Sequence, residues 1–309
     1  MFTAIKKGRL VAGLVAVSAT VALAGCSSSN PLDTSSSSAG GDGSAIVIGS
    51  QAYYSNEIIA EIYAQALEAN GVTVTRQFNI GQRDAYLPAL ESGEVQLFPE
   101  YSGNLLQYYD PETTAKTSDD VYAALKGALP EGLEVLDQSP ATDQDSYNVT
   151  KEFSDANGVT SLEDLAKVTT PITLGGNSEL QTRPYGPQGL QSTYGVTVGF
   201  TPIEDSGGPL TIQALKDNTV QLVNIYSADP NISTNNLVTL EDPKGLFLAS
   251  NIVPLINSDA ATPEVSDVIN KVSAALTAAD LVELNSQSVN DQESADKIAS
   301  DWLAKVKLF

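Results

Sequence analysis

The residue types that most often carry out covalent chemistry are scarce in this chain. Its 309 residues include no histidine and a single cysteine, Cys26. Catalytic triads that use imidazole, zinc sites built on histidine and the commonest general base are therefore ruled out. Carboxylate pairs could still hydrolyse glycosides, but the acidic residues are scattered and aromatic residues make up only 6% of the chain. We expect no catalytic residues, no metal site and no cofactor, and thus a binding protein rather than an enzyme.

An internal repeat places a tyrosine at matching positions in two halves of the chain. Residues 89–102, ALESGEVQLFPEYS, align without gaps on residues 214–227, ALKDNTVQLVNIYS, with seven of 14 positions identical. Shorter matches occur in the same order and at nearly the same offset, namely GVTV at 71–74 and 195–198, and IVIG at 46–49 with ITLG at 172–175. A period this long indicates two similar lobes rather than a solenoid.

Hydrophobic periodicity predicts that each lobe is an α/β unit. In the first half, buried or alternating strands are expected over 46–49, 72–78 and 95–98, and amphipathic helices over 56–69 and 84–92. This alternation of strand and helix is typical of an α/β sheet.

The two repeated Tyr-Ser pairs predict a shared binding site. Tyr101-Ser102 and Tyr226-Ser227 each follow the carboxyl end of a buried strand, where open α/β sheets bind ligands. If the lobes face each other across a hinge, Tyr101 and Tyr226 lie over one cleft. The alternative is that each tyrosine caps the core of its own lobe.

The first 25 residues have the pattern of a signal peptide. Lys6, Lys7 and Arg9 precede an apolar run from Leu10 to Ala22, which is shorter than the roughly 20 residues of a membrane-spanning helix. The LAGC ending at Cys26 resembles the bacterial lipobox, and this resemblance implies cleavage after residue 25 and lipid attachment to the cysteine. The alternative is that Cys26 is an inert small residue near the cleavage site.

The segment after the cysteine is predicted to be a flexible tether. Residues 26–44 are rich in Ser and Gly and lack hydrophobic periodicity. Together with Cys26, they predict a protein anchored by lipid to the extracytoplasmic face of the cell membrane.

The charge of the chain excludes some partners. The formal net charge is -22, and cleavage after residue 25 would remove three positive charges and no acidic residue. Nucleic acids and anionic membrane surfaces are bound through clusters of Lys and Arg, so neither is an expected partner. A mild preference for cationic ligands fits the charge, as does a merely well-solvated surface.

Several segments resemble a known family of binding proteins. PEYSGN at 99–104, RPYGPQGL at 183–190 and IYSAD at 225–229 are similar to the substrate-binding lipoproteins of bacterial osmoprotectant ABC importers, which carry glycine betaine, carnitine, choline and related quaternary amines. The segments NEIIAEIYAQALEANG, GQRDAYLPALESGEV and LEDPKGLFLASNIVPL also match in order.

The resemblance implies the type II periplasmic-binding-protein fold, with two α/β lobes joined by a two-crossover hinge and a ligand cleft between them. The expected domains are a lipoprotein signal peptide, a tether, lobe I in two segments and lobe II, at residues 1–25, 26–44, 45–145 with 255–309, and 146–254.

The resemblance also implies a set of ligand-binding residues. Tyr101, Tyr147 and Tyr226 would form an aromatic box, and Arg183 would grip a ligand carboxylate. Asp145 matches another position near the ligand and could face the cation. Ring faces suit a trimethylammonium group, which cannot donate a hydrogen bond, and the arginine fork suits a carboxylate. For Arg183 the alternative is a surface salt bridge.

Three further positions of the expected site depart from the common family pattern. Gln51 replaces a lysine of some members, Asn104 ends the PEYSGN segment in place of threonine, and Ser250 replaces a box tyrosine before an asparagine. These changes open the box and make it more polar, which weakens the case for glycine betaine itself and favours a choline-like or larger betaine ligand. The tyrosines expected to pack or to line the rim are Tyr53, Tyr54 and Tyr185. For Tyr53 and Tyr54, which follow a strand of the first lobe, the alternative is that they line the cleft.

We therefore expect the extracytoplasmic receptor of an ABC importer for quaternary-amine solutes, with a permease, an ATPase and, through Cys26, the membrane as partners. A receptor for another small solute, such as ergothioneine or an amino acid, remains an alternative. So does an envelope interaction lipoprotein without a transport role. Trp302, the only tryptophan, is expected to pack in the core.

Overall fold

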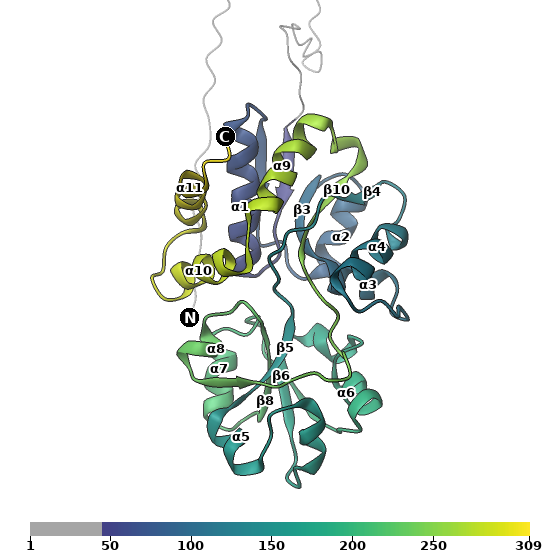
Figure 1. Cartoon of the computed structure of the whole chain (residues 1–309), viewed down its shortest axis with the longest axis vertical. Coiled ribbons are helices and arrows are strands. Elements are labelled where there is room, and N and C mark those ends of the chain that lie inside the picture. The colour runs from purple at the N-terminus through teal and green to yellow at the C-terminus, as the bar shows by residue number, and fades with distance from the viewer. Residues whose placement is uncertain (1–44) are drawn as a thin grey trace, which may run out of the picture. The chain divides into compact units, whose positions relative to one another are not determined.

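The computed structural model describes residues 45–309, which contain two five-stranded sheets, one in each of two lobes (Figure 1). The signal peptide, Cys26 and the tether predicted for residues 1–44 lie outside the described residues. The strands of lobe I are β1 (Ile46–Gly49), β2 (Val74–Gln77), β3 (Leu97–Tyr101), β4 (Leu133–Val135) and β10 (Ile252–Asn257). The strands of lobe II are β5 (Asp145–Thr150), β6 (Thr173–Gly176), β7 (Gly199–Pro202), β8 (Leu222–Tyr226) and β9 (Leu237–Thr239).

Helices cover both sheets. Those of lobe I are α1 (Tyr54–Ala69), α2 (Arg83–Glu91), α3 (Ser102–Tyr109), α4 (Ser118–Ala128), the short 3-10 helix η3 (Ser258–Ala260), α9 (Pro263–Ala275), α10 (Ala278–Val289) and α11 (Ala295–Val306). Those of lobe II are α5 (Lys151–Asn157), η1 (Leu162–Lys167), η2 (Ser178–Thr182), α6 (Pro187–Tyr194), α7 (Pro209–Lys216) and α8 (Asn231–Thr234).

The internal repeat marks equivalent positions in the two sheets. The strand order is β2-β1-β3-β10-β4 in lobe I and β7-β6-β8-β5-β9 in lobe II. The strands at the end of each repeated segment, β3 and β8, are both third in order and lie parallel to β1 and β6. The prediction of two similar α/β lobes is therefore confirmed.

The chain crosses between the lobes twice, once from β4 to β5 and once from β9 to β10. The two crossovers contact each other through an antiparallel bridge between Thr142 and Asn251. Because Ile252 pairs with Tyr101 of β3, the sheet of lobe I includes residues 252–254, which the predicted boundary assigns to lobe II. Asp145 begins β5 and so belongs to the sheet of lobe II.

Each sheet has a hydrophobic core on both faces. In lobe I one core involves α1, α9, α10 and α11, and the other involves α2, α3 and α4, on opposite sides in Figure 1. Along β10, Ile252 and Ile256 face the first core while Val253 and Leu255 face the second, as the alternation of a strand requires. Trp302 of α11 is only 3% exposed and packs in the first core, as predicted.

Lobe II has the same layered arrangement. Its larger core involves α5, η1 and α6, and its smaller core involves α7, α8 and β9. Burying each large aliphatic side chain of these cores contributes roughly 1.5–3 kcal/mol to stability. The cores hold the carboxyl ends of the strands in place, and those ends carry the candidate site.

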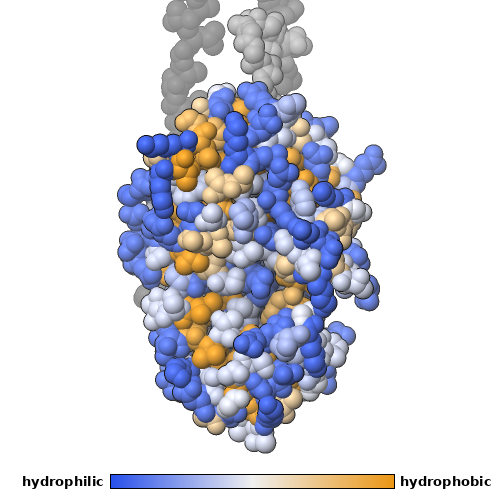
Figure 2. All heavy atoms as spheres, viewed as in Figure 1, coloured by the Kyte–Doolittle hydropathy of each residue, from blue (hydrophilic) through white to orange (hydrophobic). Residues whose placement is uncertain are grey.

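The face of the molecule seen in Figure 2 is mainly polar. Figure 2 shows a face dominated by hydrophilic residues, with hydrophobic residues in small separate groups. Among residues 45–309, no helix is both long enough and apolar enough to span a membrane.

Candidate functional site

The candidate site lies where strand ends of the two lobes meet. Tyr101 is the last residue of β3, and Tyr53 precedes α1, a few residues after β1. From lobe II, Tyr226 is the last residue of β8 and pairs with Asp145, the first residue of β5. The repeat thus delivers one tyrosine from each lobe to the same region.

Tyrosine rings make contact across the boundary between the lobes. The ring centroids of Tyr53 and Tyr226 are 4.8 Å apart with an interplanar angle of 45°, and Tyr53 also packs edge-on against Tyr54 at 4.9 Å. Tyr53 and Tyr101 are 3% and 6% exposed. Burial raises the pKa of Tyr226 well above its ordinary value, and nearby Asp145, Glu179, Tyr185 and Tyr101 raise it further. The structure therefore brings Tyr101 and Tyr226 into one site.

Tyr147 lies behind this site rather than in it. Its side chain is fully buried, its hydroxyl donates to the backbone oxygen of Tyr185 at 2.6 Å, and its ring packs against Phe247 in the core of lobe II. Tyr147 follows Asp145 by two residues on the same face of β5, so it lies farther from the boundary between the lobes. Tyr185 lies nearer to it, because its hydroxyl accepts a hydrogen bond from Asn104 of lobe I at 2.9 Å.

Three buried aspartates at the boundary, Asp143, Asp145 and Asp229, receive hydrogen bonds from uncharged donors. Asp143 accepts from the hydroxyl of Tyr53 at 3.0 Å and from the backbone of Ala228 at 2.9 Å. The other donors are the side-chain amides of Asn104 and Asn224 to Asp145, and the hydroxyl of Tyr54 and the backbone of Asn231 to Asp229. The site is therefore rich in carboxylates that lack a basic hydrogen-bond donor.

Burial sets the protonation of these aspartates. It raises the pKa of Asp143 to about 7, although the hydrogen bonds from Ala228 and Tyr53 oppose the rise and the charges of Asp229 and Asp145 add to it. Burial also raises the pKa of Asp145 and of Asp229 above their ordinary value. Since burial of an isolated carboxylate is costly, a bound cation would stabilise the ionised form.

The raised pKa of Asp143 predicts how stability depends on pH. The folded state holds this proton up to about pH 7, whereas an unfolded aspartate loses it near its ordinary value of 3.8. The folded state therefore binds more protons in this window, and the free energy of unfolding should fall as the pH rises from 5 to 8. Histidine is absent, so it contributes nothing to the slope. Urea unfolding at several pH values measures it.

Asp143→Asn should flatten this slope, because asparagine does not titrate. The exposed Asp155, in a surface ion pair with Lys151, provides the control, and Asp155→Asn should leave the slope unchanged. Parallel slopes for wild type and Asp143→Asn would contradict the assignment of the proton to Asp143.

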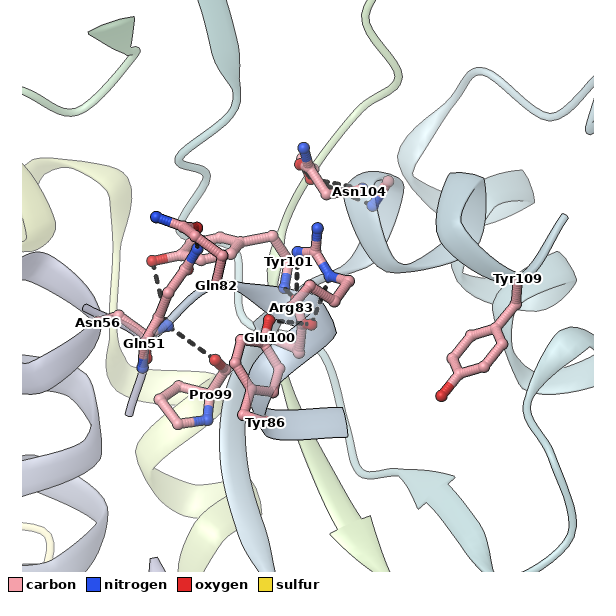
Figure 3. A network of polar contacts seen from close by, with 12 residues as sticks. Gln51, Asn56, Gln82, Arg83, Tyr86, Pro99, Glu100, Tyr101, Asn104 and Tyr109 are labelled. Carbon is pink, nitrogen blue, oxygen red and sulfur yellow. Dashed lines mark hydrogen bonds and ion pairs between the residues drawn. The ribbon is translucent and has the colours of Figure 1, made fainter. Parts of the chain in front are cut away.

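A buried ion pair positions Tyr101. The guanidinium of Arg83 donates from Nε and Nη2 to the two carboxylate oxygens of Glu100 at 2.8 and 2.9 Å (Figure 3). Glu100 also accepts from the hydroxyl of Tyr86 at 2.5 Å and from the backbone N–H of Tyr101 at 2.8 Å. The charge of Arg83 is thereby neutralised by Glu100, and the same carboxylate bonds the backbone at the end of β3.

Arg183 follows η2, close to the boundary between the lobes. Its Nη2 pairs with Glu179, and its guanidinium lies 5.8 Å from the ring centroid of Tyr108 in lobe I. Its buried Nε has no hydrogen-bond partner among residues 45–309. Arg183 thus forms a salt bridge, which was the alternative expected from the sequence. It also has an Nε–H that could donate a hydrogen bond to a ligand oxygen.

The three departures from the family pattern occupy different environments. Gln51 stays within lobe I, where its side chain donates to Gln82 at 2.6 Å and its backbone N–H donates to Asn56 at 2.8 Å (Figure 3). Asn104 and Ser250 contact each other, with the Ser250 hydroxyl donating to the Asn104 side-chain oxygen at 2.7 Å. Because Asn104 also donates to Asp145 and Tyr185 of lobe II, this pair lies at the boundary between the lobes.

The turn after β8 fastens lobe II to lobe I. Ala228 is 3% exposed and packs with the first core of lobe I, and its backbone oxygen accepts from the side chain of Asn285 in α10 at 3.0 Å. The hydrogen bond from Tyr54 to Asp229 lies alongside. The structure therefore has its lobes in contact at the site, and a depression lined by Asn104, Asp145 and Tyr185, among others, has no room for a water molecule.

Sequence reasoning missed several residues of the site. Tyr185 was expected only to pack or to line the rim. Tyr53, which follows the first strand of lobe I, was expected to pack, with a place in the cleft as the alternative. Asn224 precedes Tyr226 by two residues and so shares its face of β8, a signal that was present in the sequence. Asp143 and Asp229 lie in irregular segments, where no periodicity points to a role, although Asp229 ends the IYSAD segment that resembles the family.

Comparison with known families identifies the type of protein. Residues 44–305 match the family described as the substrate-binding domain of ABC-type glycine betaine transport systems. The chain belongs to this family. It is thus a substrate-binding protein of an ABC transporter and not an enzyme. Proteins of this family bind small ligands outside the cytoplasm and work with a permease and an ATPase.

Two curated relatives share about a quarter of the sequence. The glycine betaine-binding protein YehZ of Escherichia coli is 24% identical over 274 residues, which cover 84% of this chain and 90% of YehZ. The carnitine transport binding protein OpuCC of Listeria monocytogenes is 24% identical over 271 residues, covering 85% and 87% of the two chains.

Solved structures of the family have the same fold. A glycine betaine/carnitine/choline ABC transporter structure superposes with a TM-score of 0.68 at 21% identity, covering 85% of this chain and 99% of the other. An ABC-transporter choline-binding protein in complex with choline gives a TM-score of 0.62 at 13% identity, covering 85% and 89%. These similarities confirm the predicted type II periplasmic-binding-protein fold.

Proposed function

We propose that this substrate-binding protein captures a quaternary amine between its two lobes, with the cation held by the rings of Tyr53, Tyr101, Tyr185 and Tyr226. The proposal rests mainly on one observation: tyrosine rings from both lobes contact each other at the boundary. Beside them lie buried aspartates that accept hydrogen bonds from uncharged donors. Tyr185 takes the place that the family resemblance gave to Tyr147, which supports it from behind.

The chemistry of the ligand fits these residues. A trimethylammonium group has no N–H to donate, so ring faces and carboxylates are the groups that can attract it. Each ring contributes about 0.5–2 kcal/mol, depending on how far the site excludes water. The free Nε–H of Arg183 can donate to a ligand oxygen, whether it belongs to a hydroxyl or a carboxylate.

The names of the relatives support the same class of ligand. YehZ is named for glycine betaine and OpuCC for carnitine, and both compounds carry a trimethylammonium group.

Since the tyrosines and aspartates come from both lobes, entry of a ligand requires the lobes to separate and then close around it. The bonds between Asn104 and Tyr185 and between Tyr54 and Asp229 would break and reform in that cycle. The closed form would then dock on the permease, and ATP hydrolysis by the partner would drive release.

Cys26 is proposed to anchor the protein by its lipid, with residues 1–25 as the signal peptide and 26–44 as the tether. Cys26→Ser should move the protein from the membrane fraction of expressing cells to the soluble extracytoplasmic fraction. Equal membrane retention of the variant would argue against the anchor.

Calorimetric titration of the full chain tests the proposed function. Choline, glycine betaine, carnitine, ergothioneine and plain amino acids form the ligand panel. At least one trimethylammonium compound should bind with a dissociation constant below about 1 mM, which corresponds to about 4 kcal/mol of binding free energy. The proposal fails if none of them binds while an uncharged or primary-amine solute does.

A further inference from the structure

Ser250 and Asn104 form a closely connected pair, although 146 positions separate them. The hydroxyl oxygen of Ser250 accepts from the backbone N–H groups of Gly103 and Asn104 at 3.1 and 3.3 Å, in the first turn of α3. The same hydroxyl donates to the side-chain oxygen of Asn104 at 2.7 Å. Ser250 is 1% exposed, so these bonds have little competition from water.

This bond pattern fixes the orientation of the Asn104 amide. Its oxygen is held by Ser250, so its NH2 group must point the other way, toward lobe II. There it donates to the carboxylate of Asp145 and to the hydroxyl of Tyr185. Without the Ser250 hydroxyl the amide oxygen of Asn104 loses its donor in lobe I, and this orientation of the amide is then held only by its bonds to lobe II.

Asp145 is thus held from both lobes. Asn104 of lobe I bonds one carboxylate oxygen, and Asn224 of lobe II bonds the other at 2.9 Å. Asp145 is 5% exposed and pairs in the β-sheet with Tyr226, one of the four tyrosines proposed to hold the cation. A carboxylate can accept about four hydrogen bonds, so Asp145 keeps capacity to face a cation or a ligand hydroxyl.

Negative charge is in excess around the carboxylate of Asp145, because the nearby arginines are already paired with glutamates. Arg83 is paired with Glu100, and Arg183 is paired with Glu179. Among the residues that the structure describes, Asp145, like Asp143 and Asp229, accepts hydrogen bonds only from uncharged donors. A ligand with net positive charge reduces this imbalance, whereas a zwitterion brings a further carboxylate close to these buried aspartates.

We propose that Ser250 and Asn104 act as one unit that positions Asp145 and so makes the site favour net-cationic quaternary amines, such as choline, over zwitterionic betaines. This inference rests on the proposed function and specifies its ligand class. Ser250 and Asn104 are specificity-determining residues that act through Asp145.

A double-mutant cycle tests the unit. Ser250→Ala, Asn104→Ala and the double variant are titrated calorimetrically with choline and with glycine betaine. Wild type should bind choline more tightly, and each single variant should lower the ratio of the two affinities about tenfold. The double variant should lower it no further, because two residues that act as a unit are not additive. Ser250→Thr keeps the hydroxyl and should keep the ratio.

Matched surface variants control for general effects. Ser192→Ala and Asn157→Ala in lobe II remove hydrogen bonds of the side chain to nearby backbone oxygens and should leave the ratio unchanged. Asn104→Ala leaves Ser250 in place at the start of α3, so it tests the unit even if Ser250→Ala does not fold.

The outcomes separate this inference from the proposed function. If wild type binds no quaternary amine, the proposed function fails. If wild type binds quaternary amines but favours glycine betaine, or if the ratio is unchanged in the variants, or if their effects simply add, only the Ser250–Asn104 inference is overturned.

Discussion

Asp145→Asn is expected to weaken choline binding about hundredfold, a loss of about 2.8 kcal/mol at 25 °C. The substitution keeps the size of the side chain and removes its negative charge. Asp145 is buried between two asparagine amides, so its charge acts on a bound cation with little screening by water. The NH2 group of the introduced asparagine would also face the NH2 group of Asn104 or of Asn224, so two donors would lie opposite each other without an acceptor.

Calorimetric titration measures the effect, and the melting temperature of the variant shows whether it is folded. Asp155→Asn on the surface of α5 is the matched control and should bind as wild type does. A folded Asp145→Asn variant whose dissociation constant for choline is within threefold of wild type would show that Asp145 does not face the cation.

Arg83→Met should destabilise the fold by about 3–5 kcal/mol, because it leaves Glu100 buried without its charged partner. Arg83 is 3% exposed and Glu100 is fully buried, so water cannot replace the lost bonds. The bonds from Tyr86 and the backbone of Tyr101 remain, but both donors are uncharged. Urea unfolding at constant pH measures the change in the free energy of unfolding.

Two further variants separate the ion pair from the loss of packing. Arg83→Met combined with Glu100→Met removes both charges and should recover much of the stability, since an apolar pair of similar volume leaves no buried charge. Lys151→Met breaks an exposed ion pair and should cost less than about 1 kcal/mol. A cost for Arg83→Met as small as that for Lys151→Met would contradict the buried pair.

The presence of two similar α/β lobes could be predicted from the sequence, because the internal repeat indicates it directly. The aligned segments end at β3 and β8, which hold the same place in their sheets, so the similarity of the lobes follows from residues next to each other in the chain. The crossover boundaries were less accessible. They depend on the pairing of Ile252 with Tyr101, which lies far away in the sequence.

Only some residues of the candidate site could be predicted from the sequence. Tyr101, Tyr226 and Asp145 occupy strand ends that periodicity and the family motifs can locate, whereas Tyr53 reaches the site through a contact with the other lobe. The coupling of Ser250 to Asn104 is invisible in the sequence, because it depends on the second crossover passing the first turn of α3. The sequence identifies Ser250 and Asn104 as two separate departures from the family pattern, and only the structure shows that they contact each other.

The central claim is that a quaternary amine binds among the tyrosines at the boundary of the lobes. A crystal structure of the full chain with saturating choline tests it most directly. The choline nitrogen should lie within about 6 Å of the ring centroids of Tyr101, Tyr185 and Tyr226, with the carboxylate of Asp145 facing it. Choline bound elsewhere, with these rings still packed as in the free protein, would show that the tyrosines do not form the binding site.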